Sequence, residues 1–171
     1  SFQIGAAHLE FSRDGSFSTN NKVRITSTTV GPFPVNSYTW VTPTTNANLI
    51  GTQGKLRAVN AQATVKDDSD QSFELRGAVV TSPGTGAAVK KDAAFDLKWR
   101  SAGMGASVKI EVQVVPAGPW TLVDAAAPNT DGDNLYVWTP TNTPTDTARL
   151  RFSSATDVRA RGLTEEFKIA A

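Results

Sequence analysis

The 171-residue sequence predicts an all-β protein composed of two tandem β-sandwiches. The first observation behind this prediction is an internal repeat with three anchors. Tyr38-Thr39-Trp40 returns as Tyr136-Val137-Trp138, Lys55-Leu56-Arg57 as Arg149-Leu150-Arg151, and Phe73-Glu74-Leu75 as Phe167-Lys168-Ile169. The offset is 98 positions for the tryptophans and 94 for the other two anchors. A spacing kept this closely indicates two copies of one structural unit, residues 1–77 and 78–171.

The second observation is the period of the apolar residues. Phe95, Leu97 and Trp99 alternate with charged residues, and so do the apolar residues between Val108 and Val114. Alternation of this kind is typical of strands with one buried face, and no segment repeats with the 3.6-residue period of a helix. Trp99 is in phase with Phe95 and Leu97, so we expect it in the core.

The first copy contains five segments with strand character, separated by turns. We expect strands at residues 7–11, 23–25, 38–40, 55–59 and 73–75. Arg13-Asp14-Gly15-Ser16 and Asp67-Asp68-Ser69-Asp70 are typical turn sequences. Gly31-Pro32-Phe33-Pro34 is predicted to be a loop, because two prolines remove donors from any ladder.

The second copy follows a short junction at Arg76-Gly77. It contains seven predicted strands, at residues 79–82, 95–99, 108–114, 120–123, 135–138, 149–154 and 165–169. Seven short strands in about 94 residues, with turns at regular spacing, are typical of an Ig-like or fibronectin-like β-sandwich.

The first copy lacks the opening strands of such a sandwich. Leu9-Glu10-Phe11 matches Ile110-Glu111-Val112, yet only 8 residues precede Leu9, whereas 32 residues of the second copy precede Ile110. We therefore expect strands from another polypeptide, an identical subunit or a missing N-terminal piece to complete the first domain by β-strand addition. The predicted assembly edge consists of Leu9, Phe11, Leu56, Phe73 and Leu75. The alternative is that the first domain is simply a smaller sheet.

Composition excludes several classes of protein. The absence of cysteine excludes disulfides and thiolate chemistry, and the single histidine argues against a histidine-based metal site. The net charge of +1, with both signs scattered through both copies, does not favour nucleic acid as a partner. No apolar run approaches the roughly 20 residues of a membrane-spanning helix, so no membrane span is expected.

Aromatic residues near turns are the main candidates for ligand binding. Trp120 and Trp138 would face a glycan if they stood exposed on one surface, whereas packing within the core is the alternative. Lys55, Arg57, Arg149 and Arg151 are expected to face outward and to protect their strands from unwanted pairing.

Other polar clusters have simpler explanations than chemistry. Asp67, Asp68 and Asp70, and likewise Asp131 and Asp133, carry oxygen ligands for Ca²⁺, but neither run has the closing Glu of a calcium loop. Asx turns account for both, and no metal or other cofactor is expected. His8 lies on an alternating strand without a nucleophile motif, so no catalytic residues are predicted.

The second copy resembles a family of bacterial extracellular Ig-like repeats, similar to the Ser-Thr-rich Ig-like domain of fungal cell-wall glucan-assembly proteins. The motifs that carry the resemblance are, in order, Ser82-Pro83-Gly84, Trp99-Arg100-Ser101, Val108-Lys109-Ile110, Gly118-Pro119-Trp120, Trp138-Thr139-Pro140, Arg149-Leu150-Arg151 and Phe167-Lys168-Ile169. The family usually has an Asp-x-Ser turn before its last strand. The first copy has an acidic turn there, Asp68-Ser69-Asp70, whereas the second departs from the pattern with Arg161-Gly162-Leu163.

What the resemblance implies is a non-enzymatic structural or assembly module at the surface of a bacterial cell or outside it. Such a module would belong to a filament, a surface layer or an adhesin stalk. Its partners would be other proteins or identical subunits, with cell-wall polysaccharide as a further candidate. The alternative is a carbohydrate-binding accessory module of a secreted protein.

Overall fold

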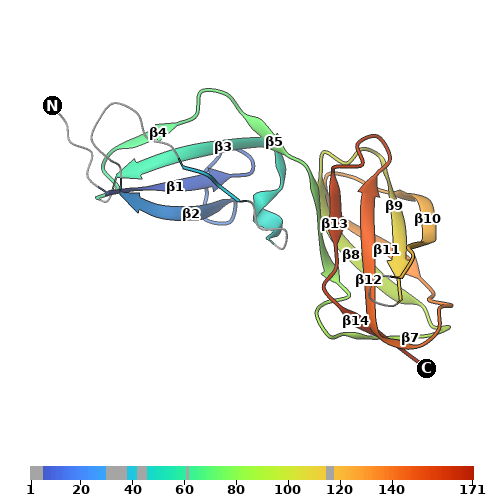
Figure 1. Cartoon of the computed structure of the whole chain (residues 1–171). Coiled ribbons are helices and arrows are strands. Elements are labelled where there is room, and N and C mark those ends of the chain that lie inside the picture. Colours follow the sequence, from blue (N-terminus) through green and yellow to red (C-terminus); the bar gives the residue numbers. More distant parts are fainter. Residues whose placement is uncertain (1–5, 30–37, 42–45, 61, 115–117) are drawn as a thin grey trace. The chain divides into compact units, whose positions relative to one another are not determined.

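The computed structural model describes residues 6–29, 38–41, 46–60, 62–114 and 118–171. The chain forms two compact units, Ser1–Leu75 (unit 1) and Arg76–Ala171 (unit 2). The described part contains strands and one short 3-10 helix, η1 (Ala47–Leu49). The predicted all-β class is therefore confirmed (Figure 1).

Unit 2 is a sandwich of two sheets. Its strands are β6 (Gly77–Ser82), β7 (Ala88–Lys90), β8 (Phe95–Ala102), β9 (Ser107–Gln113), β10 (Thr121–Pro128), β11 (Gly132–Trp138), β12 (Thr145–Ser154), β13 (Arg161–Leu163) and β14 (Phe167–Ala170). The larger sheet has the order β10-β9-β12-β14-β7, with β13 also on β12, and the smaller sheet has the order β11-β8-β6. The chain crosses between the sheets after β6, β7, β8, β10 and β11, which is an Ig-like arrangement.

Two of these strands, β7 and β13, were not predicted from the sequence. β7 ends at Lys90, in a stretch without clear alternation, and it pairs in parallel with β14. β13 pairs with β12 through only three residues. Both are too short to show a period of two, and their pairing partners lie far away in the sequence.

The core of unit 2 fills the space between its sheets. Trp99 is 1% exposed, as expected, and its ring lies 4.9 Å from that of Phe152 on the facing sheet. Trp138 is 6% exposed and meets Phe167 edge to face, with 6.3 Å between the ring centroids. Such contacts between aromatic rings add to the free energy gained from burial alone.

A buried amide connects this core to the loops of unit 2. Asn129 Oδ1 accepts hydrogen bonds from Trp99 Nε1 at 2.9 Å and from Ser101 Oγ at 2.8 Å. Its Nδ2 donates to the carbonyl oxygen of Gly105 at 2.7 Å. Both polar atoms of the Asn129 side chain thus have hydrogen-bond partners, which is the condition under which a buried amide stabilises a fold.

Unit 1 contains a single sheet in the described residues. Its strands are β1 (Ala6–Ser12), β2 (Lys22–Thr29), β3 (Gly51–Asn60), β4 (Lys66–Asp68) and β5 (Phe73–Leu75). The order is β2-β1-β3-β4, and β5 also pairs with β3. The strands β1, β2 and β3 lie side by side in Figure 1.

This sheet repeats the larger sheet of unit 2, strand for strand. The strands β1, β2, β3, β4 and β5 correspond to β9, β10, β12, β13 and β14, and each pairing of the first set recurs in the second. Within the described residues, unit 1 has no counterpart of β6, β7 or β8. The described part of unit 1 fits both expectations, a sandwich without its opening strands and a smaller sheet, and the choice between them stays a prediction.

Two predictions for unit 1 are wrong. Trp40 was expected on a strand, but Tyr38–Val41 belong to no strand, and the neighbouring residues 30–37 and 42–45 lie outside the described part. In unit 2 the counterpart β11 forms its ladder with β8, a strand that the described part of unit 1 lacks. The expected acidic turn instead begins with strand β4, because Asp67 and Asp68 pair with Ala58 and Arg57 of β3.

Candidate functional sites

The inner face of the unit 1 sheet carries the predicted assembly residues. Phe11 stands opposite Leu56, and Leu9 stands opposite Ala58, so these side chains point to the same face. Phe11 is fully buried, and its ring lies 5.4 Å from Trp40 and 5.7 Å from Phe73. The fold thus places Leu9, Phe11, Leu56 and Phe73 together on one apolar face.

This face is much less covered than its counterpart in unit 2. Leu9, Leu56, Phe73 and Leu75 are only partly buried, and Ala58 is exposed. The corresponding side chains of unit 2, Ile110, Leu150, Phe167, Ile169 and Phe152, are all at most 1% exposed. The difference follows from the second sheet, because β6, β8 and β11 cover these positions in unit 2.

The edge of β5 is also open in the described residues, where β3 is its single pairing partner. Its counterpart β14 lies between two strands, β12 and β7. β7 runs parallel to β14 and places Val89 beside Ile169, where Val89 is completely buried. An open strand edge exposes donors and acceptors that another strand can pair with.

The edge of β4 differs from that of its counterpart β13. In unit 2, Gly162 lets β6 approach closely, since a Cβ added to Gly162 would lie 2.2 Å from the carbonyl oxygen of Ala78. The corresponding position in unit 1 is Asp67, whose side chain is exposed. A strand placed as β6 is placed would therefore collide with Asp67.

The outer faces of both sheets carry matching charged clusters. In unit 2, Arg151 donates two hydrogen bonds to Glu111 Oε2, at 2.7 and 2.9 Å, and Lys109 lies 3.0 Å from Glu111 Oε1. Burial raises the pKa of Glu111, but the hydrogen bonds and charges of Lys109 and Arg151 outweigh it and leave the pKa below its usual value. In unit 1, Arg57 donates to both carboxylate oxygens of Asp68, which lies on β4 and not on the strand that corresponds to β9.

An aromatic ring covers the arginine of each cluster, and it comes from the β1–β2 connection in unit 1 and from the β9–β10 connection in unit 2. Arg151 lies over Trp120, and Arg57 lies over Phe17. The two arginines therefore face outward as predicted, but each is held in a fixed environment. Trp120, one of the two predicted glycan-facing residues, is half-buried and has one ring face against Arg151.

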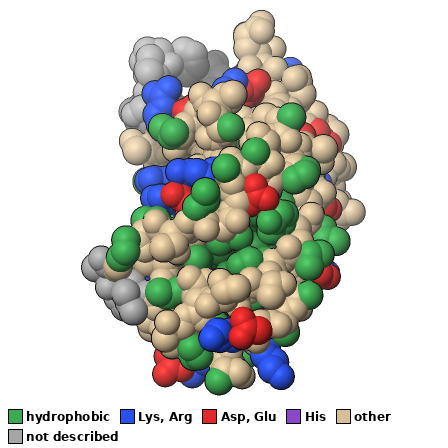
Figure 2. Space-filling view, turned by 90° about the vertical axis from the view of Figure 1, so that its right-hand side faces the viewer, with side chains coloured by type: hydrophobic (Ala, Val, Ile, Leu, Met, Phe, Trp, Pro, Cys, Tyr) green, Lys and Arg blue, Asp and Glu red, His purple; other side chains and the backbone are tan. Residues whose placement is uncertain are grey.

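Trp138, the other predicted glycan-facing residue, lines a cavity of about 430 Å³ in unit 2. The cavity lies between β10 and β11, and its walls also include Leu122, Tyr136, Thr139 and Asn142. None of its lining residues is charged, and Trp120 is not among them. The face seen in Figure 2 is hollowed at its centre, where hydrophobic side chains gather.

Polar groups border this cavity. Burial, together with the hydrogen bond and the charge of Asp124, raises the pKa of the Tyr136 phenol. Leu122 is 60% exposed and Val137 58% exposed, so apolar surface is available at the rim. The arrangement of an aromatic wall, hydroxyl groups and an amide suits a neutral polar ligand.

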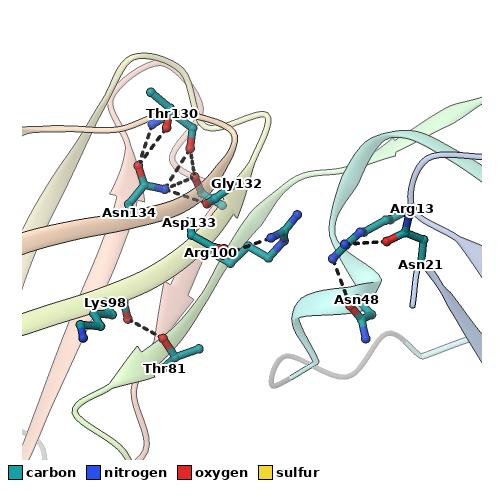
Figure 3. Close-up of polar contacts among 11 residues, drawn as sticks. Arg13, Asn21, Asn48, Thr81, Lys98, Arg100, Thr130, Gly132, Asp133 and Asn134 are labelled. Atoms are coloured by element: carbon teal, nitrogen blue, oxygen red, sulfur yellow. Dashed lines mark hydrogen bonds and ion pairs between the residues drawn. The ribbon is translucent and has the colours of Figure 1, made fainter. Parts of the chain in front are cut away.

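The acidic residues considered for Ca²⁺ are bound to protein donors where the structure describes their contacts. Asp131 Oδ1 accepts from the backbone N–H of Gly103, and Asp133 Oδ1 pairs with Arg100 at 3.1 Å (Figure 3). Among the described residues, no group of three or more His, Asp or Glu side chains is placed to hold a metal ion. His8 Nε2 lies 3.5 Å from Glu10 Oε1.

Side-chain hydrogen bonds also hold the loops beside these residues. Asn134 Nδ2 donates to the carbonyl oxygens of Thr130 and Gly132, each at 2.9 Å (Figure 3). Arg13 donates to Asn21 at 2.6 Å and to Asn48 at 3.0 Å in unit 1. These contacts are of the kind that side chains make in polar turns.

Comparison with known proteins assigns no family. No family model matches the sequence, and no curated protein matches it. A solved structure of a chimeric titin Z1Z2-Z1Z2 tandem, functionalized with a GRGDS exogenous peptide from fibronectin, is similar over 99% of this chain and 87% of that chain. The identity is 12% and the TM-score 0.33, so the fold assignment rests on the strand pairing described above. In the described part of the chain, no helix is long and apolar enough to cross a membrane.

Proposed function

We propose that this chain is a non-enzymatic structural module of an extracellular or cell-surface assembly, in which strands of another polypeptide, or of an N-terminal piece outside this sequence, complete unit 1. The observation that carries the proposal is the difference between the two copies of one sheet. Leu9, Leu56 and Phe73 are partly exposed, whereas Ile110, Leu150 and Phe167 are completely buried. The surface location and the bacterial source rest on the family resemblance.

The energetic argument follows from the exposed area. Fully burying one Leu, Ile or Phe side chain contributes about 1.5–3 kcal/mol. When several such side chains stay partly exposed, the stabilisation that is lost is comparable with the whole free energy of unfolding of a domain, roughly 5–15 kcal/mol. A partner that covers them gains this free energy on binding, and unit 1 alone is expected to be the less stable unit.

Hydrogen exchange of the isolated chain tests the proposal. We expect slow exchange for the amides of β9 and β12 and at least tenfold faster exchange for those of β1 and β3, since local stability follows burial. Sedimentation should be measured in parallel. If the chain associates and unit 1 then becomes protected, identical subunits are the partner. A monomer whose two units are equally stable contradicts the proposal.

The surface location has a separate test. An antibody against unit 2 should label intact cells of the source organism, and external protease should remove the labelling. Labelling that appears only after the cells are opened would exclude a surface assembly. This result would leave the strand-completion argument intact, because that argument rests on burial alone.

The second candidate function is carbohydrate binding at the cavity between β10 and β11. It is favoured by one observation, the uncharged lining that combines Tyr136 and Trp138 with Thr and Asn side chains. Neutral oligosaccharides are the ligands to test by calorimetry. Leu122→Arg should abolish binding, because this exposed residue lines the cavity. Leu163→Arg is the matched control, since Leu163 is 50% exposed and lies on β13, away from the cavity.

A further inference from the structure

We propose that the polypeptide which completes unit 1 supplies a short strand that runs parallel to β5. This strand places an apolar side chain beside Leu75 and carries positive charge in the residues before it. The inference rests on the proposed function and specifies the partner. Unit 2 contains a strand at this edge, β7, for which the described part of unit 1 has no counterpart.

Strand β7 is the template for the partner strand. The register of the parallel pair places Ala88 beside Lys168 and Val89 beside Ile169. Backbone hydrogen bonds continue this pair on both sides, from Gly86 N to Glu166 O at 2.8 Å and from Lys91 N to Ala170 O at 2.8 Å. The 94-residue offset relates Ile169 to Leu75, so the partner's apolar residue belongs beside Leu75.

The apolar surface that such a residue would cover lies at this end of the sheet. Phe73 and Leu75 are partly buried on β5, and the buried ring of Phe11 packs against Phe73. In unit 2, Val89 occupies the equivalent place beside Ile169, where it is completely buried, and Ile169 is 1% exposed. A valine-sized side chain is therefore the occupant that the register predicts.

The β4 end of the same sheet does not allow the close approach that β6 makes to β13 in unit 2. Asp67 stands opposite Ala58, and both side chains are exposed. Their counterparts are Gly162 and Phe152, which lie under the close approach of β6. Because Asp67 occupies the space that Gly162 leaves free, a strand placed as β6 is does not fit here, and the repeat specifies the partner strand only beside β5.

Charge indicates what precedes the apolar residue. Residues 66–75 contain three Asp, one Glu and one Lys, a net charge of −3. The corresponding residues 161–170, which are already paired with β7, contain two Glu, one Arg and one Lys and are neutral. In a parallel strand, the residues before the apolar one lie toward Asp70, whose side chain is exposed. Lysine or arginine at those positions would compensate the excess negative charge.

Synthetic peptides added to the intact chain test this inference. The first probe is the sequence of residues 85–92, which contains β7, preceded by two added lysines. The second is the same peptide with aspartate in place of the valine, and the third lacks the added lysines. Hydrogen exchange, resolved by residue with NMR, reports which amides each peptide protects at millimolar concentration.

We expect the first peptide to slow the exchange of the β5 amides at least tenfold and to leave β2 and unit 2 unchanged. The aspartate peptide should have no effect, and the peptide without lysines should bind more weakly. Asp70→Lys in the protein should remove the advantage of the lysines, as should about 1 M salt, where the Debye length is about 3 Å. Asn20→Lys, at an exposed turn position, is the control for a general change of charge.

The outcomes separate this inference from the proposed function. Protection of β2 instead of β5, equal protection by the aspartate peptide, or no protection by any peptide would overturn the inference. An isolated monomer with two equally stable units would instead overturn the proposed function, before any peptide is added. If the added lysines still strengthen the protection of β5 in the Asp70→Lys variant, the charge argument is wrong, whereas the predicted register of the partner strand is unaffected.

Discussion

The guanidinium carbon of Arg151 lies 4.4 Å from the ring centroid of Trp120. The equivalent arginine of the first copy, Arg57, lies 3.8 Å from the ring centroid of Phe17. Both arginines also pair with a carboxylate on a neighbouring strand, Glu111 in one unit and Asp68 in the other. The repeat has thus kept one arrangement on its outer face, an arginine held between a carboxylate and an aromatic ring.

Removing the arginine of unit 2 should destabilise that unit. Arg151→Ala leaves Glu111, which is 8% exposed, with Lys109 as its remaining cation, and it uncovers one face of Trp120. The expected loss is about 2 kcal/mol in the free energy of unfolding, measured with urea. Arg149→Ala is the matched control, because Arg149 and Glu166 are about half exposed, and such pairs contribute less than about 1 kcal/mol. Equal losses in the two variants would contradict this account.

Acid should remove the contribution of Glu111. Its pKa in the folded chain is lower than the usual 4.5, so ionised Glu111 contributes stability above that value, and the contribution disappears as the pH falls through the folded pKa. The difference in unfolding free energy between the natural chain and Glu111→Gln should therefore be larger at neutral pH than near pH 3. A difference that stays constant or grows on acidification would show that the carboxylate is not stabilised by Lys109 and Arg151.

The buried amide of Asn129 should be indispensable to unit 2. Asn129→Leu leaves the indole N–H of Trp99 and the hydroxyl of Ser101 without this acceptor. Unpaired buried groups cost roughly 1–3 kcal/mol each, so a loss of several kcal/mol is expected in thermal or urea unfolding. Thr143→Leu, at an exposed position, should change stability by less than about 0.5 kcal/mol. A stable Asn129→Leu variant would mean that other groups satisfy Trp99 and Ser101.

The contrast between Gly162 and Asp67 can be tested in one set of variants. Gly162→Ala should cost about 1–3 kcal/mol or more, because its Cβ would lie 2.2 Å from the Ala78 carbonyl oxygen. Gly84→Ala should be tolerated, since nothing lies within 4 Å of an added Cβ there. Asp67→Ala should leave unit 1 unchanged, as its side chain is exposed. Urea unfolding of unit 2 and hydrogen exchange of unit 1 measure these effects. If Gly162→Ala leaves the free energy of unfolding unchanged, β6 does not exclude a side chain at this position.

Several features of the fold could be predicted from local sequence. The strands that contain Leu97 and Trp99, and Ile110 and Val112, have a period of two over seven or eight residues, and these residues are all buried as expected. The repeat anchors Leu56 and Leu150, with Phe73 and Phe167, occupy equivalent strands of equivalent sheets. Pattern was sufficient here because a strand with one buried face must alternate.

The surroundings of the candidate site residues could not be predicted from local sequence. Trp120 and Trp138 both precede or follow turns, yet one packs under Arg151 and the other lines the cavity between β10 and β11. The role of either residue in glycan binding stays a prediction. Nothing local distinguishes the two rings, because their surroundings are assembled from strands far apart in the chain.

The sequence alone was sufficient to predict the all-β class and the presence of two copies of one structural unit. Both follow from the period and spacing of apolar residues along the chain. Only the tertiary structure placed β7 beside β14 and brought β6 over Gly162, and so distinguished the paired edge of β14 from the edge of β5, which is unpaired among the described residues. The physical reason is that strand edges are closed by backbone hydrogen bonds between distant segments, and these bonds have no signature in the side chains of three-residue strands.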